Sequence, residues 1–265
     1  MSTEIIELEK PKLKNPIFVE GLPGIGHVGR IAASYLVEEL KAKKFAELIS
    51  SHFMHYVLLK QSSSVHLLKN EFYYLKAKGS GRDLIILVGD SQSVDPEGHY
   101  EIANKILEYL KKYGVKEMIT LGGLGIGEVK DKPKVVGAVS DEGMGKKYKS
   151  YGIDFNTASK VGTIIGASGL LLGLGKLYGM RGLCLLGETT GYPLLPDPKA
   201  AEEVLKVLAK VLGLKMDTTK LDKKIKEMEE FIKKMEDMQR KVMGQMMQQQ
   251  MPQKKEGKEE LSYIG

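Results

Sequence analysis

Two acidic residues, Asp90 and Glu188, occupy positions from which this chain could carry out chemistry. Each follows a short apolar run, at residues 84–89 and 183–187, with the composition of a buried strand. Because α/β proteins bind ligands at the carboxyl ends of parallel strands, two carboxylates there could act as general acid and base or bind a nucleoside. Polar residues that follow strands also cap helices and turns, so a structural role is the competing interpretation.

A glycine-rich segment, Gly24-x-Gly26-x-x-Gly29, has the spacing of a dinucleotide-binding motif and follows a predicted strand at residues 17–20. Glycine permits positive φ and close backbone approach, and the N-terminus of the following helix directs free N–H groups to one point, where an anion can bind. Pro23 stiffens the turn, and no acidic residue closes the next predicted strand. We therefore expect no nicotinamide or flavin cofactor, and whether the loop holds an anion stays open.

The histidine, cysteine and serine residues form no recognisable metal-binding or nucleophilic motif. The five histidines lack the spacing of a metal site. The single cysteine, Cys184, lies in an apolar run, which argues against a disulfide framework within the chain and fits a reducing cytoplasm. No Gly-x-Ser-x-Gly elbow occurs, and Ser168 lies in a predicted apolar helix. The sequence predicts no metal and no cofactor.

The composition disfavours nucleic acid and membrane as partners. The net charge of +6 is modest, and the lysines are interleaved with glutamates rather than clustered with aromatic residues. The most apolar window, residues 161–177, contains five glycines and is short for a bilayer span. Residues 1–16 are mixed and charged, unlike a signal peptide. We expect a cytoplasmic protein.

Strand-like and helix-like runs alternate along residues 1–216. Strands are predicted at residues 17–20, 46–53, 65–68, 71–77, 84–89, 117–121, 134–139 and 183–187, and helices at residues 27–41, 99–113, 161–177 and 200–212. This alternation requires crossover connections and predicts one α/β domain, a three-layer α/β/α sandwich with a mostly parallel sheet. Residues 65–68 and 71–77, joined by Lys69-Asn70, look instead like an antiparallel hairpin.

Residues 217–251 are predicted to form one amphipathic helix with a heptad-like, coiled-coil spacing. Its apolar stripe consists of Leu221, Ile225, Met228, Ile232, Met235, Val242 and Met246. Because a single helix cannot bury such a stripe alone, the helix packs either on its own domain or, in the interpretation we favour, on other copies or other chains. Methionine side chains repack easily, which is typical of a surface that adapts to partners.

Residues 252–265 are predicted to be a flexible charged linker that ends in a small apolar tip. The linker is too polar to bury apolar surface. The tip carries Leu261, Tyr263, Ile264 and Gly265, with the free carboxylate at its end. On such a tether, the tip is a candidate peptide-like ligand for a pocket elsewhere.

Five motifs occur in order along residues 15–214. They are Ile17-Phe18-Val19-Glu20-Gly21-Leu22-Pro23-Gly24-Ile25-Gly26-His27-Val28-Gly29, Gly89-Asp90-Ser91-Gln92, Thr120-Leu121-Gly122-Gly123, Gly187-Glu188-Thr189-Thr190-Gly191-Tyr192 and Asp197-Pro198-Lys199-Ala200-Ala201. Together they resemble the proteasome assembly chaperone family in its archaeal branch. The resemblance implies an α/β/α sandwich similar to nucleoside phosphorylases and hydrolases, without established enzymatic activity. It also implies an assembly chaperone or an archaeal homo-oligomer associated with the 20S proteasome core.

The C-terminal tip departs from the pattern of the archaeal members that engage the proteasome. Those members end in a hydrophobic residue, a penultimate tyrosine and any last residue. Here Tyr263 is third from the end and Ile264 is penultimate. One residue of slip moves the ring by about 3.3 Å and reverses its side, so direct activation of the proteasome through the tip stays open.

The sequence supports two functional hypotheses. The first is a non-enzymatic, homo-oligomeric chaperone or scaffold related to proteasome assembly or association, with further copies of itself, the 20S core or another protein chain as partners. The second is a nucleoside-type hydrolase or phosphorylase that uses Asp90 and Glu188. The second requires a deep pocket with paired acids of displaced pKa.

Overall fold

The computed structural model describes residues 2–77, 79, 81–128, 130–156, 162–192 and 195–216. The chain divides into two compact units, residues 1–225 and 226–265, and every described residue belongs to the first. The predicted helix at 217–251, with its stripe, and the linker and tip at 252–265 lie outside the described residues. The domain boundaries and these two segments therefore stay predictions.

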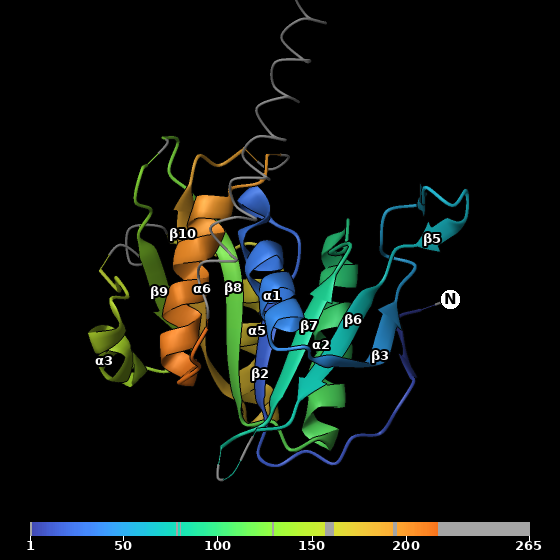
Figure 1. Ribbon diagram of the computed structural model, residues 1–265, viewed down its shortest axis with the longest axis horizontal. Helices are drawn as coiled ribbons and strands as arrows, with labels where there is room; N and C mark the ends of the chain where they lie inside the picture. Colours follow the sequence, from blue (N-terminus) through green and yellow to red (C-terminus); the bar gives the residue numbers. More distant parts are fainter. Residues whose placement is uncertain are drawn as a thin grey trace, which may run out of the picture. The chain divides into compact units, whose positions relative to one another are not determined.

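An eight-stranded sheet forms the middle layer, and helices cover both of its faces (Figure 1). The strand order is β1-β3-β6-β7-β2-β8-β10-β9. The strands are β1 (Glu4–Glu7), β2 (Ile17–Gly21), β3 (Lys43–Ile49), β6 (Asn70–Leu75), β7 (Leu84–Gly89), β8 (Glu117–Gly125), β9 (Val135–Val139) and β10 (Arg181–Thr189). Strands β3, β7, β2, β8 and β10 run in one direction, whereas β1, β6 and β9 are antiparallel to their neighbours. The predicted α/β/α sandwich is confirmed.

Four longer helices form the two outer layers. Helices α1 (Val28–Glu39) and α6 (Pro198–Leu212) contact each other on one face of the sheet, and α2 (Pro96–Lys112) and α5 (Ala167–Gly175) contact each other on the opposite face (Figure 1). Shorter helical segments are η1 (Ile25–His27), α3 (Met144–Tyr148), η2 (Lys149–Tyr151) and η3 (Lys176–Tyr178).

Aspartate caps fix where α2 and α6 begin. The side chain of Asp95 accepts a hydrogen bond from the Gly98 N–H at 2.7 Å, and that of Asp197 accepts one from the Ala200 N–H at 2.9 Å. Each aspartate is followed by a proline in the first helical turn, where the missing N–H costs nothing. The helix predicted at residues 99–113 is confirmed, and the Asp95 cap sets its start earlier, at Pro96.

Side chains alternate between the two faces of the central strands and contribute to a hydrophobic core on each face of the sheet. In β2, Phe18 packs with Ile85 and Leu87 towards α2 and α5, whereas Val19 packs with Ile86 towards α1 and α6. All of these side chains are fully buried. A strand covered on both faces must be apolar at consecutive positions, which is why β7 is predicted from sequence with the bounds that it has in the structure.

The predicted hairpin of residues 65–68 and 71–77 is wrong. Strand β5 (Val65–Leu67) pairs with β4 (Val57–Leu59) in a separate two-stranded sheet, which we call the ribbon. Strand β6 instead pairs with β3 and β7 in the main sheet. Asn70, read as part of a turn, is the first residue of β6 and is fully buried.

Two other predicted elements differ in their bounds. The apolar run at 161–177 is helical only over Ala167–Gly175, because Gly162 and Gly166 adopt positive φ values of 73° and 90° before the helix starts. The strand predicted at 46–53 lies earlier, at Lys43–Ile49. Within the part of the chain that the structure describes, no helix is long and apolar enough to cross a bilayer.

Candidate functional site

Asp90 and Glu188 lie at the same edge of the sheet, as predicted, but they do not form a pair. Asp90 directly follows β7 and Glu188 lies near the end of β10, and strands β2 and β8 separate β7 from β10. With a strand spacing of about 4.8 Å, the two backbone positions are about 14 Å apart. A reaction that needs two carboxylates on one small substrate is not supported by this placement.

Asp90 is occupied by three groups of the protein itself. Its Oδ1 atom lies 3.3 Å from Nη2 of Arg30 in α1, and its Oδ2 atom lies 2.7 Å from Nε2 of His66 in β5. The backbone N–H of Lys69 also donates to Oδ2, at 3.3 Å. Asp90 therefore ties α1 and the ribbon to the end of β7.

Glu188 is buried and is likewise satisfied locally. Its Oε2 atom accepts hydrogen bonds from Lys130 Nζ and from the backbone N–H of Lys134, both at 3.1 Å. The hydrogen bond to Glu188 raises the pKa of Lys130, which keeps the lysine charged beside the carboxylate. Glu188 thus anchors the segment that leads into β9, and the structural interpretation of both acidic residues is the one that the geometry supports.

The last glycine of the dinucleotide-like motif, together with two glycines outside it, allows close backbone packing. A methyl group on Gly29, in the first turn of α1, would collide with the Leu121 carbonyl oxygen of β8. A methyl group on Gly21 would collide with the Gly29 carbonyl oxygen, and one on Gly123 with the Ile25 carbonyl oxygen. Helix α1 therefore sits on β2 and β8 at a distance that only glycine allows. Gly26 adopts a positive φ of 63°, whereas a methyl group on Gly24 would meet no atom closer than 3.7 Å. Close packing therefore accounts for Gly29 and backbone conformation for Gly26.

The loop between β2 and α1 is held by polar groups from two later segments. The Gln92 side chain donates its Nε2–H to the Pro23 carbonyl and accepts the Ala167 N–H at 2.8 Å. The Asp197 N–H donates to the Gly26 carbonyl at 2.8 Å. Gln92 thus joins the loop to the start of α5, and Asp197 joins it to the start of α6.

A buried polar cluster lies beneath α5, where β2, β8 and β10 carry Glu20, Thr120 and Cys184 in register. Burial raises the pKa of Glu20 to about 7, although the Leu22 N–H donates to its Oε1 atom at 2.9 Å. Burial also raises the pKa of Cys184 to about 12, so its thiol stays protonated and unreactive. Ser168 donates its hydroxyl to the Leu121 carbonyl at 3.0 Å and is therefore structural.

A cavity of about 310 Å³ lies at the amino ends of the parallel strands, away from Asp90 and Glu188. Its walls include Tyr148, Tyr151 and Leu212, and Glu117 lies in it with Arg82 Nη1 at 2.9 Å. The arginine holds the pKa of Glu117 below its ordinary value against the opposing effect of burial. Sequence reasoning missed this cavity because its lining comes from segments that are distant in the chain.

His52 bridges two acidic residues at the start of α2. Its Nδ1 atom lies 2.9 Å from Asp95 Oδ2, and its Nε2 atom lies 3.3 Å from Glu101 Oε2. The hydrogen bond to Asp95 raises the pKa of His52. Among the residues that the structure describes, no group of three or more His, Cys, Asp or Glu side chains is placed to hold a metal ion.

Comparison with known proteins places the fold in a family. A model of the PAC2 family matches residues 18–236. The chain is 48% identical to PbaB of Pyrococcus furiosus, described as an archaeal proteasome activator, over 89% of this chain and 99% of that chain, with a TM-score of 0.82. It is 33% identical to PbaA of the same organism, described as an archaeal homolog of proteasome-assembly chaperone, over 91% and 99% of the two chains, with a TM-score of 0.70.

A curated relative extends the match along the whole sequence. MJ1210 of Methanocaldococcus jannaschii is 38% identical over 253 residues, which cover 96% of this chain and 93% of that protein. The similarity therefore includes the α/β/α core and continues beyond residue 216. These matches agree with the resemblance inferred from the ordered glycine motifs, and the chain belongs to the PAC2 family.

Proposed function

We propose that this chain is a homo-oligomeric, non-enzymatic protein that associates with the 20S proteasome core and acts in its assembly or activation. The observation that carries the proposal is the 48% identity to PbaB, described as an archaeal proteasome activator, over 89% of the chain. The similarity to PbaA, described as a homolog of proteasome-assembly chaperone, points in the same direction.

The chemistry of the sheet edge supports the non-enzymatic part of the proposal. Asp90 and Glu188 each bind a basic group of the protein, and the strand order keeps them on separate strands. Cys184 is fully buried with a raised pKa. No observation favours the hydrolase or phosphorylase alternative.

The C-terminal tip is the segment that we assign to the proteasome. Leu261, Tyr263, Ile264 and the carboxylate of Gly265 offer two apolar anchors, an aromatic ring and a terminal charge, the elements that a groove with a basic end recognises. The charged stretch at 252–260 would let the tip reach such a groove without moving the folded core.

The test uses the full chain and a purified archaeal 20S core. Association is measured by native electrophoresis and light scattering, and activation by hydrolysis of a fluorogenic peptide. A chain that lacks residues 261–265 should lose association. A matched control that lacks residues 254–258 removes as many residues but keeps the tip, and should retain it.

Two results would contradict the proposal in different ways. If the full chain neither binds the core nor increases the yield of core assembled from its separate subunits, the proteasome is not its partner. If deletion of the tip leaves binding unchanged, the assignment of the tip is wrong, although the partner stands.

A further inference from the structure

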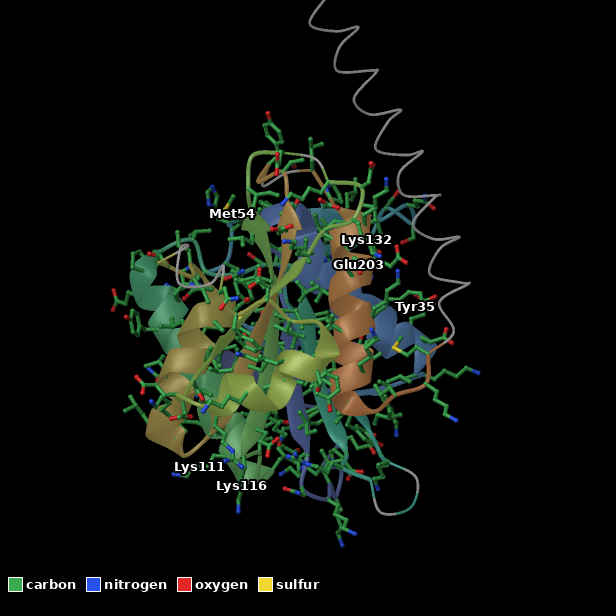
Figure 2. The ribbon with its side chains drawn as sticks, turned by 90° about the vertical axis from the view of Figure 1, so that its left-hand side faces the viewer. Tyr35, Met54, Lys111, Lys116, Lys132 and Glu203 are labelled. Carbon is green, nitrogen blue, oxygen red and sulfur yellow. The ribbon has the colours of Figure 1, made fainter. Side chains whose placement is uncertain are left out.

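The ribbon presents an aliphatic face to solvent. Directly opposite residues of an antiparallel pair lie on the same face, and the pairs Val57 with Leu67 and Leu59 with Val65 therefore share one face. The four side chains of this ribbon face are exposed to 48%, 58%, 75% and 68%, in that order. Figure 1 shows the ribbon standing out beside β3 and β6. In Figure 2, Met54, which precedes the ribbon, lies at the opposite end of the described residues from Lys111 and Lys116.

The other side of the ribbon is fixed to the body of the protein. The remaining cross-strand pair is Leu58 with His66, of which Leu58 is 42% exposed and His66 Nε2 contacts Asp90 Oδ2 at 2.7 Å. The Lys69 N–H, just after β5, donates to the same oxygen. The ribbon is therefore held in a defined orientation, with its polar contact inwards and its aliphatic face outwards.

A partner on the ribbon face would be energetically favourable. The ribbon face exposes roughly 400 Å² of apolar area, which lies within the range of about 300–600 Å² for the largest patch on a typical monomer, a patch that often marks an interaction site. A two-stranded sheet is also only marginally stable in water without packing on one face. Covering the face would remove apolar area from water and would at the same time stabilise the two-stranded ribbon.

The chemistry of the face indicates what covers it. The ribbon face carries only Val and Leu, so it has no charge or hydrogen-bonding group with which to select a polar partner. Two copies related by a two-fold axis present the same uncharged surface to each other, so that the surface is complementary to itself. With the exposed Met54 and Tyr56 included, two copies could bury at most about 1,200 Å², which reaches the lower limit for a specific interface.

We propose that the ribbon face of Val57, Leu59, Val65 and Leu67 is the surface through which two copies of this chain pair. This inference rests on the homo-oligomeric part of the proposed function and names the surface that forms the contact. Each ribbon packs on the ribbon of the other copy, and the Asp90 contacts hold both in the docking orientation.

The first test is the mass of the full chain in solution, measured by light scattering after size exclusion. Leu59→Lys places a like charge on both copies and should weaken pairing at least 10-fold, so that the concentration at which the mass falls to half of the paired value rises at least 10-fold. Leu177→Lys is the matched control, since Leu177 in η3 is 80% exposed and lies outside the ribbon, and it should leave the mass unchanged. A monomeric wild-type chain, or an unchanged mass for Leu59→Lys, overturns the proposal.

The second test uses a thiol introduced at the face. Cys184 is fully buried, so Leu59→Cys supplies the one reactive thiol among the residues that the structure describes. A short bis-maleimide should then link two copies of Leu59→Cys, whereas Leu177→Cys should remain unlinked. Absence of linked dimer from Leu59→Cys, or linkage to a proteasome subunit in a mixture with the 20S core, overturns the proposal.

The two tests separate this inference from the proposed function. Association with the 20S core is measured on the unlinked wild-type chain. If that association is present but Leu59→Cys fails to cross-link, the interface is wrong and the function stands. If cross-linking succeeds but the core is not bound, the interface stands and the proteasome assignment fails.

Discussion

The carboxyl edge of the sheet and the ribbon differ in which side chains they leave exposed to solvent. At the edge, the polar groups that a substrate would use are bound by the protein itself, as with Asp90 to Arg30 and His66. On the ribbon, aliphatic groups that a folded chain ordinarily buries stand in water, Leu59 at 75% exposure. In this α/β/α sandwich, protein groups occupy the acidic residues at the edge where related architectures bind small molecules, and the ribbon exposes an apolar surface of the kind that often marks an interaction site.

The largest expected effect concerns the close packing of α1 on β8 at the carboxyl edge of the sheet. Gly29→Ala would force a methyl group into the Leu121 carbonyl and should lower the free energy of unfolding by about 3 kcal/mol. Chemical denaturation measures it. Gly173→Ala is the control, because a methyl group there meets no atom within 4 Å and should stabilise α5 by about 0.5–1 kcal/mol. Wild-type stability for Gly29→Ala would reopen a ligand-binding role for the loop.

The second prediction concerns the buried acid below the edge. The folded-state pKa of Glu20 is about 7, above the ordinary value of 4.5, so the folded protein holds this proton more tightly than the unfolded chain. The contribution of Glu20 to stability is therefore greatest at low pH and falls as the pH rises from 4.5 through 7. Between pH 5 and pH 8, the wild-type chain should lose about 2 kcal/mol relative to Glu20→Gln.

Denaturant unfolding of both chains at several pH values checks this prediction. Glu142→Gln, at an exposed position after β9, is the matched control and should follow the wild-type pH profile. A difference between wild type and Glu20→Gln that does not change with pH would mean that Glu20 is ionised throughout.

The third prediction acts on the contact that joins the two regions. Asp90→Asn removes the charge that binds Arg30 and His66 and should cost about 1–2 kcal/mol. The more telling readout is hydrogen exchange, which should become faster in β4 and β5 while β7 and β8 stay protected. Asp131→Asn, at an exposed position, is the control. Unchanged exchange in the ribbon would show that Asp90 does not hold it.

The smallest expected effect concerns His52, which contacts Asp95 at the start of α2. His52 has a raised pKa because of Asp95, so its stabilising contact is complete below the ordinary value of 6.5 and is lost as the pH rises through the higher folded-state value. His52→Asn should therefore lower the melting temperature slightly at pH 6 and less at pH 9. His55→Asn, in the same loop and exposed, should show no such pH dependence.

Local patterns predicted the parts of the fold that local rules determine. The apolar run of β7 was recognisable because a strand buried on both faces is apolar at consecutive positions. Helix α2 was recognisable at residues 99–113 from its helical periodicity. The hairpin prediction failed because strand pairing is decided by contacts far along the chain. Asn70 reads as a turn residue, yet β6 pairs on both sides with β3 and β7.

In the candidate site, too, local sequence predicted some features, whereas others depend on contacts between distant segments. Sequence reasoning placed Asp90 and Glu188 at one sheet edge, because the ends of parallel strands meet there. It could not reveal their partners, since His66 and Lys130 lie in segments whose positions depend on the tertiary fold. The exposed ribbon face was also missed, because an alternating apolar run is normally read as a buried one.

The outermost strand of the sheet bears on how many copies can join. Strand β1 is four residues long, with Glu4 and Glu7 at its two ends, and it occupies one end of the strand order. An incoming strand would have to lay its backbone between two carboxylates along a very short stretch, which discourages continuation of the sheet from molecule to molecule. The short acidic edge therefore disfavours open-ended strand addition at β1, so that association of copies through other surfaces is not accompanied by growth of the sheet at this border.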